Sequence, residues 1–299
     1  MNDYRELLER YAQVDENVPL AHMTTLRIGG NARYVAYPEN FLSLEGLMRV
    51  IAENGIPYKM IGKGSNLLCA DRPFEGVVIR LDRHFTDCYF DGEYVTAEAG
   101  ASIIALAYEA MKNGLSGLEF ASGIPGTVGG VIFMNAGAYK SSVADIVDSV
   151  SVYRDGKIEW LSPEECAFAY RTSIFQQHPE WIVLAARFRL AHEDQNAIRS
   201  LMDSRRERRM ASQPLDFPSA GSVFRNPMDT PAWKLIEGIG YRGRQIGGAK
   251  VSEKHVNFIV NVGGATAADF ATLADEIIEK VRETYGVDLH MEVEKFNWQ

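Results

Sequence analysis

The stretch SGIPGTVGG at residues 122–130 places four glycines and a proline in nine positions. Such a stretch does not continue a helix or a strand, because glycine loses the most backbone entropy on folding and proline removes a backbone donor. A second glycine-rich loop, GKGSN at 62–66, follows the strand-like segment 57–61. Two such loops, about 55 residues apart, indicate that the main chain closely approaches either a ligand or another part of the protein at both places.

Bare backbone N–H groups in glycine loops bind phosphate, yet the two common templates are not matched. A Walker A loop needs lysine after its last glycine, and Ala249 follows Gly248 here. A Rossmann fingerprint fits Gly62 and Gly64 but needs a third glycine where Leu67 stands. From the residues alone, the two loops either flank one diphosphate ligand or are both tight turns.

Charge and cysteine content narrow the class of protein. The net charge of −9 argues against a protein whose main function is to bind nucleic acid. No apolar run approaches the roughly 20 residues of a membrane span. The cysteines Cys69, Cys88 and Cys166 are scattered, which fits a reducing compartment. We therefore expect a cytoplasmic protein without nucleic-acid, membrane or obligatory protein partners, and the histidine spacing predicts no metal site.

Strands and helices are predicted to mix without strict alternation, which indicates an α+β fold. A domain boundary is expected near the prolines of QPLDFPSAG, after a helix at about 195–211. The other predicted helices lie at 4–11, 44–51, 102–113, just after Pro231, and at 266–285. The predicted strands lie at 33–37, 57–61, 76–81, 94–100, 181–190, 223–226, 257–262 and 288–296, with a hairpin at 149–161.

The two loops resemble a known family. IGKGSNLL (61–68) followed by SGIPGTVGGVIFMNAGAY (122–139) is similar to the FAD-binding half of the vanillyl-alcohol-oxidase (PCMH) type flavoproteins. More narrowly, the chain resembles the UDP-N-acetylenolpyruvoylglucosamine reductases, in their shorter (type II) subclass. The motifs keep the family's order over nearly the full chain. The further motifs are TTLRIGGNARY (24–34), YRTSIF (170–175), AGSVFRNP (220–227), IGGAKVSEKHVNFIVN (246–261) and MEV (291–293).

This resemblance implies an FAD-binding fold of that type plus a C-terminal α+β substrate-binding domain. The implied divisions are 1–75 and 76–195 for two FAD-binding subdomains and 205–299 for the substrate domain, with the last strand returning to the first subdomain. FAD would be bound non-covalently, and NADPH would be a co-substrate. The implied cofactor-binding residues are Ile61, Gly62, Lys63, Gly64, Ser65, Asn66, Leu67, Gly123, Pro125, Thr127, Val128, Gly129, Asn135, Ala136, Gly137 and Ala138.

The implied reaction reduces a UDP-linked enolpyruvyl amino sugar to UDP-N-acetylmuramate for bacterial cell walls. Arg171 would grip the substrate carboxylate, Ser222 would donate a proton, and Glu292 would help stabilise the developing charge. The residues alone also allow a solvated arginine, a turn serine and an outward carboxylate. They do not separate Glu292 from Glu294; the resemblance selects Glu292.

Three further residues, Arg225, Asn226 and Lys250, are expected to contact the UDP part of the substrate. Only about 26 residues separate Ser222 from Gly248, too few for the tyrosine-bearing loop of the longer subclass. An FAD-dependent oxidase of the same fold, acting on another alcohol or sugar, is the alternative reading.

Overall fold

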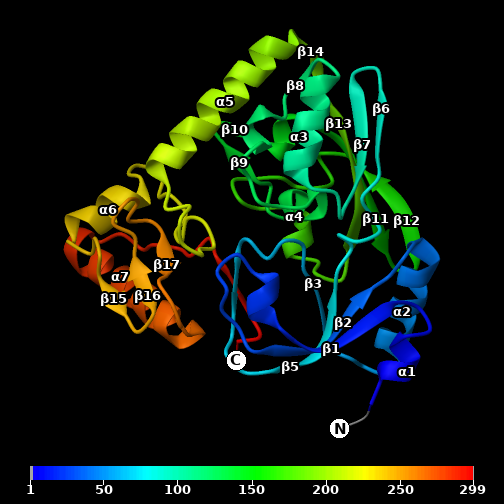
Figure 1. Ribbon diagram of the computed structural model, residues 1–299, viewed down its shortest axis with the longest axis horizontal. Coiled ribbons are helices and arrows are strands. Elements are labelled where there is room, and N and C mark those ends of the chain that lie inside the picture. The colour runs from blue at the N-terminus through cyan, green and yellow to red at the C-terminus, as the bar shows by residue number, and fades with distance from the viewer. Residues whose placement is uncertain (1–2, 299) are drawn as a thin grey trace. The chain divides into compact units, whose positions relative to one another are not determined.

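The computed structural model describes residues 3–298 of the chain, which divides into two compact units (Figure 1). Unit 1 comprises Met1–Asp15, Tyr34–Lys63 and Gly76–Arg208, and unit 2 comprises Glu16–Arg33, Gly64–Glu75 and Arg209–Gln299. Each unit is therefore made of three chain segments that are separate in sequence. The three-part domain division expected from the sequence stays a prediction.

Unit 1 is built around a five-stranded antiparallel sheet in the order β12-β11-β13-β7-β6. Helix α4 packs against β13 and β7 (Figure 1), and helix α3 begins after its cap Ser102, as predicted. Both helices contribute buried apolar side chains to the core of unit 1. The bounds are β6 Cys88–Asp91, β7 Tyr94–Glu98, α3 Ile103–Lys112, α4 Val128–Phe133, β11 Val147–Arg154, β12 Lys157–Leu161 and β13 Ile182–Arg189.

The hairpin between β11 and β12 confirms the turn chemistry read from the sequence. Asp155 and Gly156 both have positive φ, at 50° and 76°. Such a pair suits the tight turn whose twist matches that of the flanking strands. Val150 therefore lies opposite Leu161 in the register, and both side chains are buried in the core.

The N-terminal third forms a second sheet in the order β1-β2-β5-β3, with β3 and β5 parallel. Helix α2 follows β2 and is capped by Asn40, whose side chain accepts the N–H of Ser43. The expected β-α-β unit is thus present, but β5 lies between its two strands. The bounds are α1 Arg5–Leu8, β1 Gln13–Pro19, β2 Asn31–Tyr37, α2 Phe41–Glu53, β3 Tyr58–Met60, β4 Leu67–Cys69 and β5 Phe74–Ile79.

Unit 2 packs helices α6 and α7 with a small antiparallel sheet, β15-β16-β17 (Figure 1). Helix α7 begins at a reciprocal capping box between Thr266 and Asp269 and ends at Gly286, which is left-handed at φ 66°. These signals were predictable, because they are local in sequence. The bounds are α6 Ala232–Gly238, β15 Gln245–Ile246, β16 Ala249–Val251, β17 Ile259–Asn261, α7 Ala267–Tyr285 and β18 Glu294–Phe296.

Three predicted elements are wrong in extent or type. The N-terminal helix spans only Arg5–Leu8, and residues 223–226 form no strand but an isolated bridge from Phe224 to Met291. The closing strand is confined to Glu294–Phe296, which pairs in parallel with β4. The remaining elements are β8 Leu115–Ser116, β9 Gly137–Ala138, β10 Ser141–Ser142, β14 Ala191–His192, α5 Gln195–Ser212 and the short 3-10 turns Leu20–Met23, Glu119–Ala121, Val143–Asp145 and Ile174–Gln176.

Candidate functional site

The two glycine-rich loops meet within unit 1. A Cβ added at Gly62 would lie 2.6 Å from Thr127 Oγ1, so the first loop runs directly against the second. Thr127 is buried and caps α4 by accepting the N–H of Gly130 at 3.2 Å. Gly62 and Gly123 remain partly accessible, and Pro125 is exposed. Main chain from two distant segments thus converges with little side-chain cover.

Other glycines of these loops are required by protein packing. A Cβ at Gly64 would lie 2.1 Å from the carbonyl oxygen of Met23, and Gly64 has a φ of 59°. A Cβ at Gly129 would lie 3.1 Å from the Cβ of Ala99, and its N–H donates to the Ala99 carbonyl. At these positions, close contacts within each unit already explain the absence of a side chain. The chain passes from unit 1 to unit 2 between Lys63 and Gly64.

A charged cluster lies beside the first loop. Lys63 Nζ donates to Asp82 Oδ2 at 3.0 Å, and Arg80 Nη2 pairs with the same oxygen at 2.5 Å. Burial alone would raise the pKa of Asp82, but the hydrogen bonds and charges of Arg80 and Lys63 lower it on balance. Asp82 therefore stays ionised and fixes the amino group of Lys63, a predicted cofactor contact.

The predicted cofactor segment 135–138 is tied into unit 1 by the side chain of Asn135. This side chain is buried, and its Oδ1 accepts the N–H of Ala144 at 3.0 Å while its Nδ2 donates to the Ala169 carbonyl at 2.8 Å. The φ of Asn135 is 40°, a left-handed value that asparagine tolerates better than most residues. Its amide thus links the segment to the loop that carries Arg171.

Arg171 sits at a tight turn with a left-handed φ of 55°. Ala169 and Thr172 exchange both backbone hydrogen bonds at 3.0 Å, which leaves Tyr170 and Arg171 as the two turn residues. A non-glycine residue in this conformation costs on the order of 1–3 kcal/mol, and such strain gathers at functional sites. The guanidinium Nη2 donates to the Gly137 carbonyl at 2.8 Å, so Arg171 lies against the predicted cofactor segment.

Ser222 lies in unit 2 next to a backbone segment held by Asn257. The Val223 N–H donates to the Asn257 carbonyl at 2.8 Å. The Asn257 side chain accepts the Phe224 N–H at 3.0 Å and donates to the Phe224 carbonyl at 2.9 Å. Asn257 is buried, and it satisfies the backbone of the two residues that follow Ser222. The preceding Gly221 has a φ of 79°, which glycine adopts at little cost.

Glu292 is hydrogen-bonded through its backbone to Val223, the residue that follows Ser222. Its N–H donates to the Val223 carbonyl at 2.7 Å, whereas the Glu294 N–H donates to the Asn66 carbonyl at 2.9 Å. Asn66 Nδ2 also donates to the Glu292 carbonyl at 3.0 Å. Unit 2 therefore brings together the end of the GKGSN loop, the Ser222 segment and the MEV motif, while Arg171 belongs to unit 1.

The predicted substrate contacts have partners within unit 2. Lys250 Nζ lies 2.5 Å from Glu253 Oε1, and Asn226 Oδ1 accepts the N–H of Ala232 at the start of α6. The Arg225 N–H donates to the His290 carbonyl at 2.9 Å. Their role toward a substrate stays a prediction.

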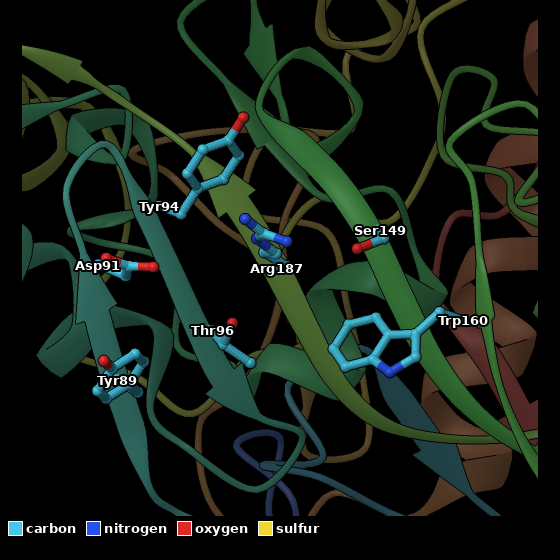
Figure 2. A pocket seen from close by; sticks show the side chains of 7 residues that line it. All are labelled: Tyr89, Asp91, Tyr94, Thr96, Ser149, Trp160 and Arg187. Carbon is cyan, nitrogen blue, oxygen red and sulfur yellow. The ribbon is translucent and has the colours of Figure 1, made fainter.

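A separate pocket of about 490 Å³ lies on the five-stranded sheet of unit 1, and every strand of that sheet contributes to it (Figure 2). It contains no predicted site residue; it is lined by Tyr89, Asp91, Tyr94, Thr96, Ser149, Trp160 and Arg187. Among residues 3–298, no group of three acidic, histidine or cysteine side chains is placed to hold a metal. In the same described part of the chain, no helix has the length and apolar character to cross a membrane.

Comparison with known proteins identifies the family. A model of the C-terminal domain of UDP-N-acetylenolpyruvoylglucosamine reductase matches residues 213–296, and a model of an FAD binding domain matches residues 32–162. The reductase of Bacillus licheniformis is 45% identical over 94% of this chain and 93% of its own length. The chain belongs to the UDP-N-acetylenolpyruvoylglucosamine reductase family.

Further members of the reductase family agree over nearly the whole chain. The Bacillus subtilis reductase is 44% identical over 97% of this chain and 96% of its own length. The crystal structure of the Thermus caldophilus reductase superposes with a TM-score of 0.81 at 35% identity, covering 96% of this chain and all of that one. The fold is therefore an FAD-binding domain of the vanillyl-alcohol-oxidase (PCMH) type with the C-terminal domain of this reductase family, as the sequence predicted.

Sequence reasoning missed polar residues that hold the backbone, two of them next to predicted site residues. Asn257 and Gln176 were not singled out, although each is a polar side chain next to apolar residues, in HVNFIV and SIFQ. Asp71 was missed as well; its two carboxylate oxygens accept the N–H groups of Ala267 and Ala268 at 2.8 and 3.2 Å. A polar residue within an apolar stretch was the available signal for the first two. Asp71 gave none, because its partners lie 196 and 197 residues away.

Proposed function

We propose that this chain is an NADPH-dependent UDP-N-acetylenolpyruvoylglucosamine reductase that forms UDP-N-acetylmuramate for peptidoglycan synthesis. The observation that carries the proposal is similarity to the reductase over nearly the full length of both chains. The three cysteines are free thiols, which supports action in the cytoplasm, the compartment of its nucleotide-linked substrate.

The chain's own residues fit a non-covalent FAD. Two partly accessible stretches of main chain come together at Gly62 and Thr127, and a side chain at position 62 would clash with Thr127 Oγ1. The residues that would hold the cofactor are those of 61–67, 123–129 and 135–138 named above. Bound FAD would supply hydride transfer between NADPH and the enolpyruvyl double bond.

Arg171 binds the carboxylate of the enolpyruvyl group in this proposal. Hydride addition to the methylene carbon moves negative charge onto that carboxylate, and a planar guanidinium offers two parallel hydrogen bonds to it. The Gly137 carbonyl holds one edge of the guanidinium, so its orientation is set before substrate arrives. An interaction that strengthens as charge develops lowers the barrier rather than only improving binding.

Ser222 delivers the proton to the carbon that bears the carboxylate. A serine hydroxyl is a weak acid, so it needs a neighbour that supplies or stabilises charge. Glu292 is the candidate in unit 2, because its backbone N–H is hydrogen-bonded to the carbonyl of Val223, the residue that follows Ser222. We assign Glu292 to orienting the reacting group or relaying the proton, and Arg225, Asn226 and Lys250 to the UDP moiety.

The test separates the two halves of the reaction. The purified protein is expected to show the flavin band near 450 nm, to bleach with NADPH, and to recover its colour when the enolpyruvyl sugar nucleotide is added without oxygen. Ser222→Ala is expected to bleach normally and to recover at least 100-fold more slowly. Recovery with oxygen but not with the enolpyruvyl substrate would instead identify an oxidase. Normal recovery in Ser222→Ala would remove Ser222 from the mechanism.

A further inference from the structure

We propose that Gln176 is a positioning residue for Arg171, and that it works with Asn135 to hold the strained turn that presents the guanidinium. The inference rests on the proposed function for the role of Arg171. It adds two residues that act through Arg171, and neither is assigned contact with substrate in this role.

The turn at Arg171 lacks the residue that its conformation favours. A turn with positive φ at its second central residue is normally built with glycine or asparagine there. Arginine with a φ of 55° persists only where the surroundings over-determine the backbone. Contacts outside the turn must therefore hold it.

Gln176 supplies one such contact through a single amide group. Its Nε2 donates to the Arg171 carbonyl at 3.0 Å and to the Phe133 carbonyl at 3.0 Å. Phe133 is the last residue of α4, so the amide links the turn to the end of that helix. Ser173 Oγ donates to the same Phe133 carbonyl at 2.6 Å and reinforces the attachment.

Asn135 holds the first residue of the turn. Its Nδ2 donates to the carbonyl of Ala169, the residue that closes the turn with Thr172. Its Oδ1 is occupied by the Ala144 N–H, so the buried amide is fixed at both ends. The guanidinium itself is held by Gly137. Residues 133–137 thus fix both the backbone and the side chain of Arg171.

Left-handed backbone gathers in the two segments that these bonds connect. Positive φ occurs at Asn135, Tyr139 and Lys140 in one segment and at Ala167 and Arg171 in the other. Such a cluster of non-glycine residues is the backbone signature of a pre-organised site. If the Arg171 carbonyl is released, the turn can relax toward an unstrained conformation, and the guanidinium then moves away from its productive direction.

The test compares Gln176→Glu with Gln177→Glu. Glutamate has the shape of glutamine but accepts hydrogen bonds only, so at position 176 it faces two carbonyl oxygens without a donor. Gln177 is the exposed neighbour, and its substitution introduces the same charge. Gln176→Met and Gln177→Met repeat the comparison without charge, which keeps the test available if Gln176→Glu does not fold.

We expect the Gln176 variants to keep their FAD content and to bleach with NADPH within twofold of the parent rate. Recovery of colour with the enolpyruvyl substrate is expected to slow by about 10- to 100-fold, since small misplacement of a catalytic group has effects of this size. The Gln177 variants are expected to stay within twofold in both steps. Equal slowing of both steps, or recovery within twofold in the Gln176 variants, would overturn the proposal.

Hydrogen exchange supplies a readout that does not depend on turnover. Amides in a peptide covering residues 169–173 are expected to exchange at least tenfold faster in the Gln176 variants than in the Gln177 variants. Equal exchange in the two sets would also overturn the proposal. If the parent protein does not reduce the enolpyruvyl substrate, the proposed function has failed, and the exchange result alone then decides whether Gln176 holds the turn.

Discussion

Asn66 both donates to and accepts from the segment 292–294, although 226 residues separate it from Glu292. The Asn66 side chain donates to the Glu292 carbonyl at 3.0 Å, and the Asn66 carbonyl accepts the Glu294 N–H at 2.9 Å. The sequence motif predicts Asn66 as a cofactor contact. Asn66 thus also aligns the segment that carries Glu292, the predicted catalytic glutamate. The two uses do not conflict, because the amide side chain and the backbone N–H groups of a loop can serve different partners.

Replacement of Asn66 by alanine is expected to lower the free energy of unfolding by about 1–2 kcal/mol, because it leaves a partly buried carbonyl without its donor. Urea unfolding of the FAD-free protein measures this without a contribution from cofactor binding. Asn31→Ala, at the exposed start of β2, is the matched control and is expected to change stability by less than about 0.5 kcal/mol. Equal losses in the two variants would contradict the role of Asn66.

Local signals in the sequence predicted the elements whose ends are set by neighbouring residues. Thr266 and Gly286 delimit α7 through a capping box and a left-handed cap, and Asp155-Gly156 forms the hairpin turn. The segment after Ser222 was predicted as a strand, yet its hydrogen bonds go to Asn257 and Glu292. No pattern within a short window specifies partners so distant.

The candidate site, like the fold, was predictable only in part. The two glycine loops could be recognised from their composition. Arg171, Ser222 and Glu292 could be selected only through the family resemblance, because the residues alone also allow each of them to be an ordinary surface residue. The contact between Gly62 and Thr127 had to come from the structure. The hydrogen bonds of the Gln176 side chain to two carbonyl oxygens also had to come from the structure, because a glutamine next to apolar residues does not indicate which acceptors it binds.

Asn257 is expected to be important for both stability and turnover. Asn257→Leu leaves the N–H and the carbonyl of Phe224 unpaired in a buried place, which is expected to cost about 2–4 kcal/mol of unfolding free energy. Because this backbone leads directly from Ser222, the reduction of the enolpyruvyl substrate is expected to slow more than NADPH-driven bleaching. Thermal unfolding and half-reaction kinetics measure the two effects. A variant that loses stability but keeps the ratio of the two rates would show that Asn257 does not position Ser222.

Gly62 and Gly130 provide a paired test of the contact between the loops. A methyl group at position 62 would lie 2.6 Å from Thr127 Oγ1, whereas one at position 130 would meet only that atom, at 3.4 Å. Gly62→Ala is therefore expected to separate the loops and to lower the FAD content of the purified protein. Gly130→Ala lies in helix α4 and is expected to be neutral or to stabilise the protein by up to about 1 kcal/mol. The ratio of flavin to protein absorbance, with thermal unfolding, gives the result. Full FAD content in Gly62→Ala would show that the loops tolerate separation.

Ionised Asp82 is expected to make the free energy of unfolding fall as the pH is lowered. Its folded-state pKa is lowered, on balance, by Arg80 and Lys63, so the ionised form is favoured in the folded state. A depressed carboxyl pKa contributes stability that is present above the unfolded value of 3.8 and is lost as pH falls through the folded value. Asp82→Asn removes this contribution, which is expected to be about 1–2 kcal/mol at pH 7 for a nearly buried carboxylate with charged donors.

The difference in unfolding free energy between the parent protein and Asp82→Asn is therefore expected to stay constant from pH 7 down to about pH 5 and to shrink below about pH 4. Guanidinium unfolding at pH 7, 5, 4 and 3 measures it, and Asp155→Asn, at the exposed hairpin turn, serves as control. A difference that persists undiminished at pH 3 would mean that the carboxylate acts through shape or packing and not through its charge. In that case the orientation of Lys63 within the first glycine loop would have to come from another contact.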